Sequence, residues 1–223
     1  MKDQNKMIEI ICIWDRSGSM QSLVSDAIGG FNSFLEKEKK NSPDSQLTLV
    51  LFHDYWEIVE DGAKITAVEP LNEKSYVPDR CTALYDTLGD TLKQVSERLE
   101  KTAPEARPSK VLVAIFTDGL ENASIKYSSK QIQDLIKCQR EIHGWEFLFL
   151  AANQDAIATG ESIGVHRSQA INVSATPIGY HSVGEAVSFA TAGVSGGQNV
   201  DSLNVQKHYD ATLAKEEQKR KKK

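Results

Sequence analysis

The segment IEIICIWDRSGS, residues 8–19, decides the fold, because a buried strand runs directly into a polar loop. Ile8 to Trp14 is an isoleucine-rich apolar run, which predicts a buried β-strand. Oxygen-bearing side chains follow at alternate positions (Asp15, Ser17, Ser19), and Gly18 allows the backbone to turn tightly. In open α/β sheets, ligands bind just beyond the carboxyl ends of the strands, so this loop is a candidate binding loop.

Strand-like and helix-like segments alternate along the rest of the chain. Helical spacing of apolar residues predicts helices over 22–38 and 83–100, and capping boxes (Ser128 with Gln131, Ser182 with Glu185) predict helices that begin at Ser128 and Ser182. A short helix is also expected from about Asp155 to Ser162. Asp61-Gly62 lies between two strand-like runs and predicts a hairpin. The expected strands cover residues 8–14, 47–52, 56–60 with 64–68 as the hairpin, 111–116, 145–151 and 170–173.

This alternation predicts an α/β fold, with a doubly wound, mostly parallel six-stranded sheet covered by helices on both faces. The fold is Rossmann-like, and the inserted hairpin suggests one antiparallel edge strand. If the strand order is 3-2-1-4-5-6, the first and fourth strands are neighbours at the switch point. One domain is expected over residues 7–193. Residues 194–223 are expected to form a linker and a basic tail, which could be partly helical on Leu203, Tyr209 and Leu213 or disordered.

Composition limits the functional classes. The 223 residues are 40% hydrophobic, which suits a single domain with a sizeable core. The formal net charge is −5, and the tail from Lys215 contributes +4, so the remainder of the chain carries −9. An acidic body argues against nucleic-acid binding. We see no apolar run long enough for a membrane span, no signal peptide and no disulfide framework among three cysteines, so a cytoplasmic location is expected.

Two further polar clusters fall at strand or helix ends. Thr82 precedes the helix over 83–100, and Asp118-Gly119 follows the strand over 111–116. Together with Asp15, Ser17 and Ser19, they supply two carboxylates and three hydroxyls. Oxygen ligands suit hard cations, so Mg²⁺ is expected, with Mn²⁺ and Ca²⁺ as alternatives. Taken alone, the Asp-Ser-Ser loop could equally be a helix cap.

Asp15-x-Ser17-x-Ser19, followed by Thr82 and then Asp118-Gly119, resembles the metal-ion-dependent adhesion site of the von Willebrand factor A family. The resemblance covers about residues 7–193 and is closer to stand-alone bacterial or phage members than to animal adhesion modules. It implies that Ser17, Ser19 and Thr82 bind the metal through their hydroxyls. It also implies that Asp15 and Asp118 supply negative charge, directly or through water. One departure is Arg80, which stands where several family members have glycine.

The resemblance implies a protein-binding module, not an enzyme, in which the metal captures an Asp or Glu of a partner protein. Arg80, His53, Asn153 and Gln154 are candidate partner-binding residues at the rim of the site. Two alternatives stay open: a metal-dependent hydrolase or phosphotransferase, and a metal-free scaffold of the same fold. The enzyme alternative lacks a second acid in an Asp-x-Asp motif, a P-loop and a nucleophile elbow.

Overall fold

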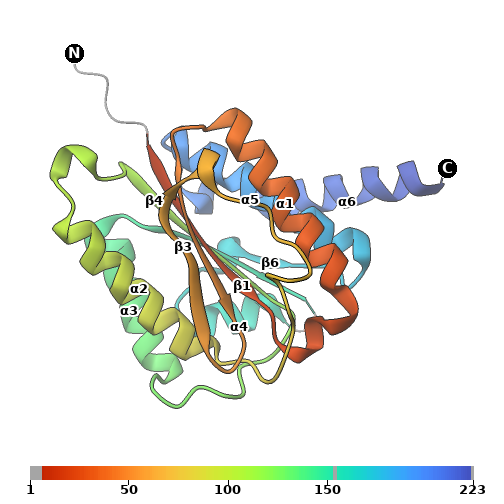
Figure 1. The fold of residues 1–223 in the computed structure, drawn as a ribbon, viewed down its shortest axis with the longest axis horizontal. Helices are drawn as coiled ribbons and strands as arrows, with labels where there is room; N and C mark the ends of the chain where they lie inside the picture. The colour runs from red at the N-terminus through yellow and green to blue at the C-terminus, as the bar shows by residue number, and fades with distance from the viewer. Residues whose placement is uncertain (1–6, 153–154, 222–223) are drawn as a thin grey trace.

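The computed structural model describes residues 7–152 and 155–221, which form a six-stranded sheet between two layers of helices (Figure 1). The strand order is β3-β2-β1-β4-β5-β6, as predicted, and the β2–β3 pair is the antiparallel one at the edge. The remaining neighbours pair in parallel. The strands are β1 (Ile8–Asp15), β2 (Gln46–Phe52), β3 (Trp56–Lys64), β4 (Lys110–Thr117), β5 (Glu146–Ala151) and β6 (Ala170–Asn172).

The central strands are apolar at nearly every position because both of their faces are buried. Side chains of β1 alternate between two separate cores: Ile10 and Cys12 enter one, whereas Ile11 and Ile13 enter the other. β4 repeats the pattern. This period of two is that of an extended strand, and the continuous apolar run is what a parallel sheet covered on both sides requires.

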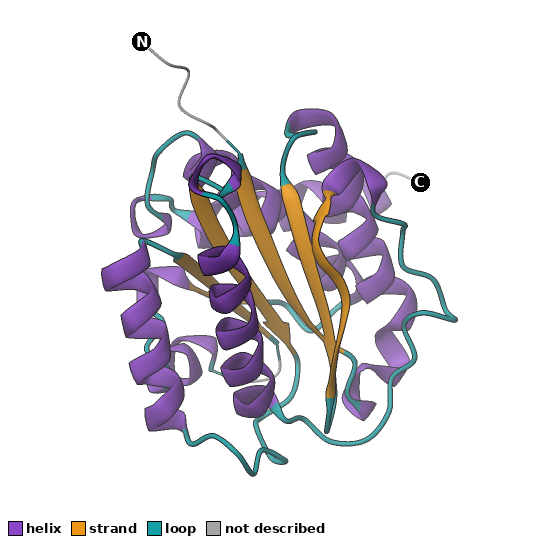
Figure 2. Ribbon diagram, turned by 60° about the vertical axis from the view of Figure 1, so that its left-hand side comes forward, coloured by secondary structure: helices purple, strands orange, loops and turns teal. Residues whose placement is uncertain are grey.

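Helices lie on both sides of the sheet (Figure 2), and their buried side chains divide between the two cores. Buried side chains of α1, α5 and α6 belong to one core, and those of α2, α3 and α4 belong to the other. The expected capping box at Ser128 is present, and Asp155 is the N-cap of the short helix α4. The helices are α1 (Val24–Asn41), α2 (Leu84–Lys101), α3 (Ser129–His143), α4 (Ala156–Ser162), α5 (Pro177–Ser195) and α6 (Val205–Lys221), with short 3-10 turns between several elements.

The hairpin predicted around Asp61-Gly62 is wrong. β3 runs through both residues and pairs with β2, and the register shifts opposite Thr48. Gly62 has a φ of 63°, and its amide donates to the Thr48 hydroxyl at 2.9 Å. Asp61-Gly62 is therefore a bulge within one strand, and the true hairpin turn is His53–Tyr55. Two-residue hairpin turns and glycine bulges favour the same residue types, so the Asp-Gly pair was wrongly interpreted as a hairpin turn.

The helix predicted to begin at Ser182 begins earlier, at Pro177. Thr176 is the N-cap, because its hydroxyl accepts from the Gly179 amide at 3.1 Å, and Pro177 occupies the first helical position. The Ser182 hydroxyl instead donates to the carbonyl of Ile178, one turn earlier. The Ser182 capping pattern inside the helix was therefore mistaken for the true N-cap at Thr176.

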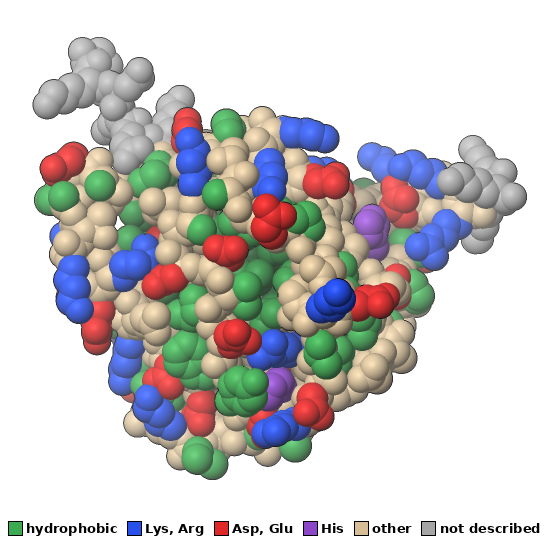
Figure 3. Space-filling model, viewed as in Figure 1, with side chains coloured by type: hydrophobic (Ala, Val, Ile, Leu, Met, Phe, Trp, Pro, Cys, Tyr) green, Lys and Arg blue, Asp and Glu red, His purple; other side chains and the backbone are tan. Residues whose placement is uncertain are grey.

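The chain after Val194 packs against the domain. Val200, Val205 and Tyr209 are buried in the same core as α1 and α5. Gln206 covers the free edge of β6, because its side chain accepts from the Asn172 amide at 2.8 Å and donates to the Asn172 carbonyl at 3.4 Å. The far half of α6 projects from the body and carries Lys and Arg side chains (Figure 3). The domain boundary at residue 193 stays a prediction.

None of the helices within the described residues combines the length and apolar character needed to cross a membrane.

Candidate metal centre

The loop after β1 is fixed by the carboxylate of Asp15, which is completely buried. One oxygen of that carboxylate accepts from the Ser17 amide at 2.7 Å, and the other accepts from the Thr117 hydroxyl at 2.5 Å. The backbone carbonyl of Asp15 accepts from the Tyr76 hydroxyl. These bonds curl the chain beyond β1, so that the side chains of Ser17 and Ser19 turn to the same side.

The predicted ligands come together at the carboxyl end of the sheet. Ser19 Oγ donates to Asp118 at 2.5 Å and lies 3.1 Å from Ser17 Oγ. Gly119 marks the centre of the set: a Cβ atom built there would lie 2.9 Å from Thr82 Oγ1, 3.5 Å from Ser19 Oγ and 3.8 Å from Ser17 Oγ. Three hydroxyl oxygens from two loops therefore face one point, with a carboxylate bonded to one of them.

Thr82 is held in this position by the loop after β4. The Thr82 amide donates to Asn122 Oδ1 at 2.9 Å, and the Asn122 amide donates to the Thr82 carbonyl at 3.0 Å. Glu121 of the same loop accepts from the Tyr85 amide at 2.9 Å, which fastens the loop to the first turn of α2. This reciprocal pairing ties the loop that carries Asp118 to the segment that carries Thr82.

Burial makes both carboxylates costly to ionise. It raises the pKa of Asp15 to about 6, against the opposing effect of the hydrogen bonds from Thr117 and Ser17. Burial likewise raises the pKa of Asp118, although its bond from Ser19 opposes the shift. A divalent cation close to both groups would favour their charged forms, so the electrostatics of the site fit a cation.

The donor set fits a hard cation. Over residues 7–152 and 155–221, no three His, Cys, Asp or Glu side chains gather closely enough to hold a metal ion. A site here would therefore depend on hydroxyl oxygens besides the two carboxylates. All-oxygen coordination is what Mg²⁺ and Ca²⁺ prefer.

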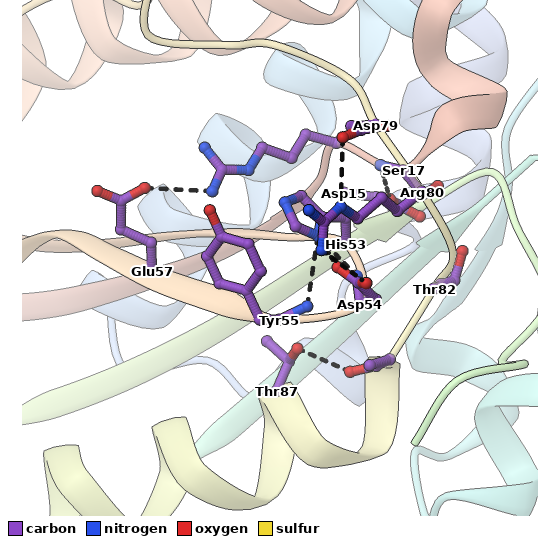
Figure 4. A network of polar contacts seen from close by, with 12 residues as sticks. Asp15, Ser17, His53, Asp54, Tyr55, Glu57, Asp79, Arg80, Thr82 and Thr87 are labelled. Atoms are coloured by element: carbon purple, nitrogen blue, oxygen red, sulfur yellow. Dashed lines mark hydrogen bonds and ion pairs between the residues drawn. The ribbon is translucent and has the colours of Figure 1, made fainter. Parts of the chain in front are cut away.

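The predicted rim residues differ in their roles. His53 is buried, and its Nδ1 lies 2.5 Å from Asp54 Oδ1. Its backbone carbonyl accepts from the Ala83 amide at 2.7 Å, so it fixes the entry to α2. Arg80 is exposed and pairs with Asp54 at 3.2 Å and with Asp79 at 3.3 Å (Figure 4). Asn153 and Gln154 lie outside the described residues.

Arg80 also connects the two loops through its backbone. Its carbonyl accepts from the Gly18 amide at 3.0 Å, and the Asp79 amide donates to the Arg16 carbonyl at 3.0 Å. Arg80 has a φ of 60°, a left-handed conformation that is costly for a residue with a Cβ atom. The position where several family members have glycine is thus one where glycine would be unstrained.

The sequence analysis did not identify three residues that shape the site: Thr117, Tyr76 and Asn122. Thr117 could have been found from the sheet register, because it follows Phe116, the partner of Trp14, and so lies opposite Asp15. Tyr76 and Asn122 lie in loops whose path no periodic pattern indicates, and nothing in the sequence points to their contacts.

No family model matches the sequence, and no curated protein matches it. Solved structures do match. Proximal thread matrix protein 1 from the mussel byssus, in the form with a zinc-occupied MIDAS motif, has a TM-score of 0.58 at 16% identity, covering 83% of this chain and 48% of that one. A von Willebrand factor type A protein from Catenulispora acidiphila has a TM-score of 0.56 at 12% identity, covering 83% and 42%.

The vWF domain of the type V pili tip protein Mfa5 from Porphyromonas gingivalis has a TM-score of 0.62 at 10% identity, covering 83% of this chain and 95% of that one. This chain therefore spans less than half of the first two proteins but nearly all of the isolated domain. The likeness extends over most of the chain and agrees with the strand order and the single antiparallel edge pair. This chain has the fold of von Willebrand factor A domains.

Proposed function

We propose that this protein is a divalent-metal-dependent protein-interaction module. The observation that supports the proposal is the convergence of the Ser17, Ser19 and Thr82 hydroxyls around Gly119, next to the carboxylate of Asp118. The three hydroxyls would bind the metal, and Asp15 and Asp118 would offset its charge. A bound cation would attract a carboxylate, so the partner would offer an Asp or a Glu.

The solved neighbours support the general class of this function. They are von Willebrand factor A-type structures, and one of them carries a metal in its MIDAS motif. Capture of an acidic side chain, and the absence of catalysis, are our proposals for this chain. Mg²⁺ is the proposed metal because the donors are all oxygens, with Mn²⁺ and Ca²⁺ as alternatives. The cytoplasmic location stays a prediction.

The direct test is calorimetric titration of metal-stripped protein with Mg²⁺, Mn²⁺, Ca²⁺ and Zn²⁺. We expect saturable binding of about one ion per chain, and a loss of binding in the double variant Ser17→Ala/Asp118→Ala. The matched control is Asp134→Asn, which removes an exposed carboxylate on α3 that pairs with Lys130 at 2.7 Å, away from the site. That control should bind as the unaltered chain does.

Two other outcomes would redirect the interpretation. Absence of binding at millimolar ion would favour the metal-free scaffold. Metal-dependent hydrolysis of a phosphate ester that is lost in Asp15→Ala would favour the hydrolase alternative over the binding module.

A further inference from the structure

Exposed hydrophobic side chains are concentrated around the candidate metal centre. Among the described residues, six large hydrophobic side chains are exposed, and four of them lie in the three loops at this end of the sheet: Tyr55, Val77, Leu120 and Ile125. The other two are Val59 on β3 and Ile142 at the end of α3. Because these loops border the candidate metal centre, their exposed apolar side chains are candidates for contact with a partner bound there.

Three of these residues follow directly after residues of the site, and we name them the apolar rim: Tyr55, Val77 and Leu120. Tyr55 follows Asp54, the partner of Arg80. Val77 follows Tyr76, whose hydroxyl binds the Asp15 carbonyl. Leu120 follows Gly119, at the centre of the hydroxyl set. The apolar rim thus comes from three loops that the site itself holds together.

Contacts with neighbouring residues hold Tyr55 and the loop of Leu120 in place. The Tyr55 ring packs edge-on against His53 with centroids 4.2 Å apart, and the Arg16 guanidinium lies 5.8 Å from its centre. The Leu120 loop is fastened through Asn122 to the backbone of Thr82. Because these side chains are already ordered, they would lose little conformational freedom when a partner binds.

The charges around the site are already paired with one another. Arg80 lies between Asp54 and Asp79, and Arg16 binds Glu57 at 3.1 Å (Figure 4). These two arginines and three carboxylates together carry a net charge of −1, so a second or third carboxylate on the partner would meet no net attraction from them. The surroundings of the candidate metal centre therefore favour apolar contacts over additional acidic ones. Figure 3 shows hydrophobic side chains that reach the surface between charged ones at the lower end of the molecule.

We propose that the apolar rim selects a partner segment in which a single Asp or Glu is flanked by large apolar side chains. This inference rests on the proposed function, because the acidic residue is expected to engage the metal while its neighbours contact Tyr55, Val77 and Leu120. It rejects a polyacidic segment as the preferred ligand.

The test is selection of a random twelve-residue peptide library on the full chain, with Mg²⁺ and with chelator. We expect Mg²⁺-dependent enrichment of peptides that carry one acidic residue with large apolar residues within about three positions. An enriched peptide is then synthesised and titrated by fluorescence anisotropy. In Val77→Ser/Leu120→Ser, its affinity should fall at least about tenfold, while the calorimetric affinity for Mg²⁺ alone stays within twofold.

Tyr55 is left intact in that variant because its ring supports His53. The matched control is Val59→Ser/Ile142→Ser, which removes the two exposed hydrophobic side chains away from the site and should leave peptide affinity unchanged. Enrichment of acidic peptides without apolar neighbours, or of polyacidic peptides, would overturn the inference but not the proposed function. No Mg²⁺-dependent enrichment, or equal binding in chelator, would contradict both.

Discussion

Gly119 lies where a side chain would collide with the hydroxyl groups of the candidate site. Its φ is outside the left-handed region, so alanine can adopt the same backbone. The new methyl group would lie 2.9 Å from Thr82 Oγ1, too close for both to keep their places. Because the Thr82 side chain can rotate, we expect Gly119→Ala to fold normally but to turn this hydroxyl away from the metal.

Gly119→Ala should therefore lower the affinity for Mg²⁺ by at least about tenfold, since mutating even the residues that orient metal ligands typically costs about 10- to 100-fold. Calorimetric titration measures the affinity, and thermal unfolding in chelator checks the fold. Gly196→Ala at the end of α5 is the control, since its nearest neighbours would be 3.3 Å away. An unchanged affinity in Gly119→Ala would mean that Thr82 is not a ligand.

At this scale, the sequence predicted the residues with donor atoms but not the residues that position them. Ser17, Ser19, Thr82 and Asp118 lie together in the structure, whereas the Asp15 carboxylate is bonded to the Ser17 amide and the Thr117 hydroxyl. That these five residues bind a metal stays a prediction. Asn122 could not be predicted, since its role depends on two loops 40 residues apart meeting in space. Arg80 was expected at the rim of the site, and its ion pair with Asp54, 26 residues away in the sequence, became visible only in three dimensions.

At the scale of elements, α1 and α5 cross at unusually close range because glycine faces glycine. A Cβ atom on Gly184 would lie 2.1 Å from the Gly30 carbonyl oxygen, and one on Gly30 would lie 2.7 Å from the Tyr180 carbonyl oxygen. Both obstacles are backbone atoms, so the helices themselves would have to separate. The sequence analysis did not identify this contact, because a glycine in a helix shows no periodic signal.

Gly184→Ala should lower the free energy of unfolding by about 3 kcal/mol, the upper part of the range for overpacking a core. Urea unfolding measures this change. Gly29→Ala on α1 is the matched control, because its methyl group would meet only the His181 side chain at 3.3 Å and alanine favours the helix. Equal stability of the two variants would contradict the close crossing.

Most elements were predictable for a physical reason: burial on one face imposes a period on the sequence, and burial of a strand on both faces imposes a continuous apolar run. The errors arose where local signals are ambiguous. Asp61-Gly62 serves a bulge as readily as a turn, and Ser182 with Glu185 imitates a helix start inside α5. Deciding between such alternatives requires the position of the neighbouring strand or helix.

For the whole molecule, Glu38 links stability to pH. This side chain is only 2% exposed, and burial raises its pKa from 4.5 to about 7. The folded state therefore holds a proton that the unfolded state releases between these values. Stability conferred by the protonated group is present below pH 4.5 and is lost as pH rises through about 7, by up to about 3 kcal/mol.

Glu38→Gln should remove this contribution. We expect the variant to match the unaltered chain near pH 4.5 and to exceed it in unfolding free energy by about 1–3 kcal/mol at pH 8. Urea unfolding of both proteins across this range in chelator isolates the effect of Glu38, since other titrating groups are shared. A difference that does not vary with pH would show that Glu38 is ionised in the folded state.

The side chains that cover β6 have a practical consequence for anyone who shortens this chain. An open strand edge is a template on which another molecule can add its own strand, and proteins that leave one open tend to self-associate. Gln206 and Tyr209 occupy the backbone groups of residues 172 and 174, so the last helix protects this border of the sheet. A chain cut at the predicted boundary, after residue 193, would lose that protection. Soluble fragments should therefore extend past Tyr209.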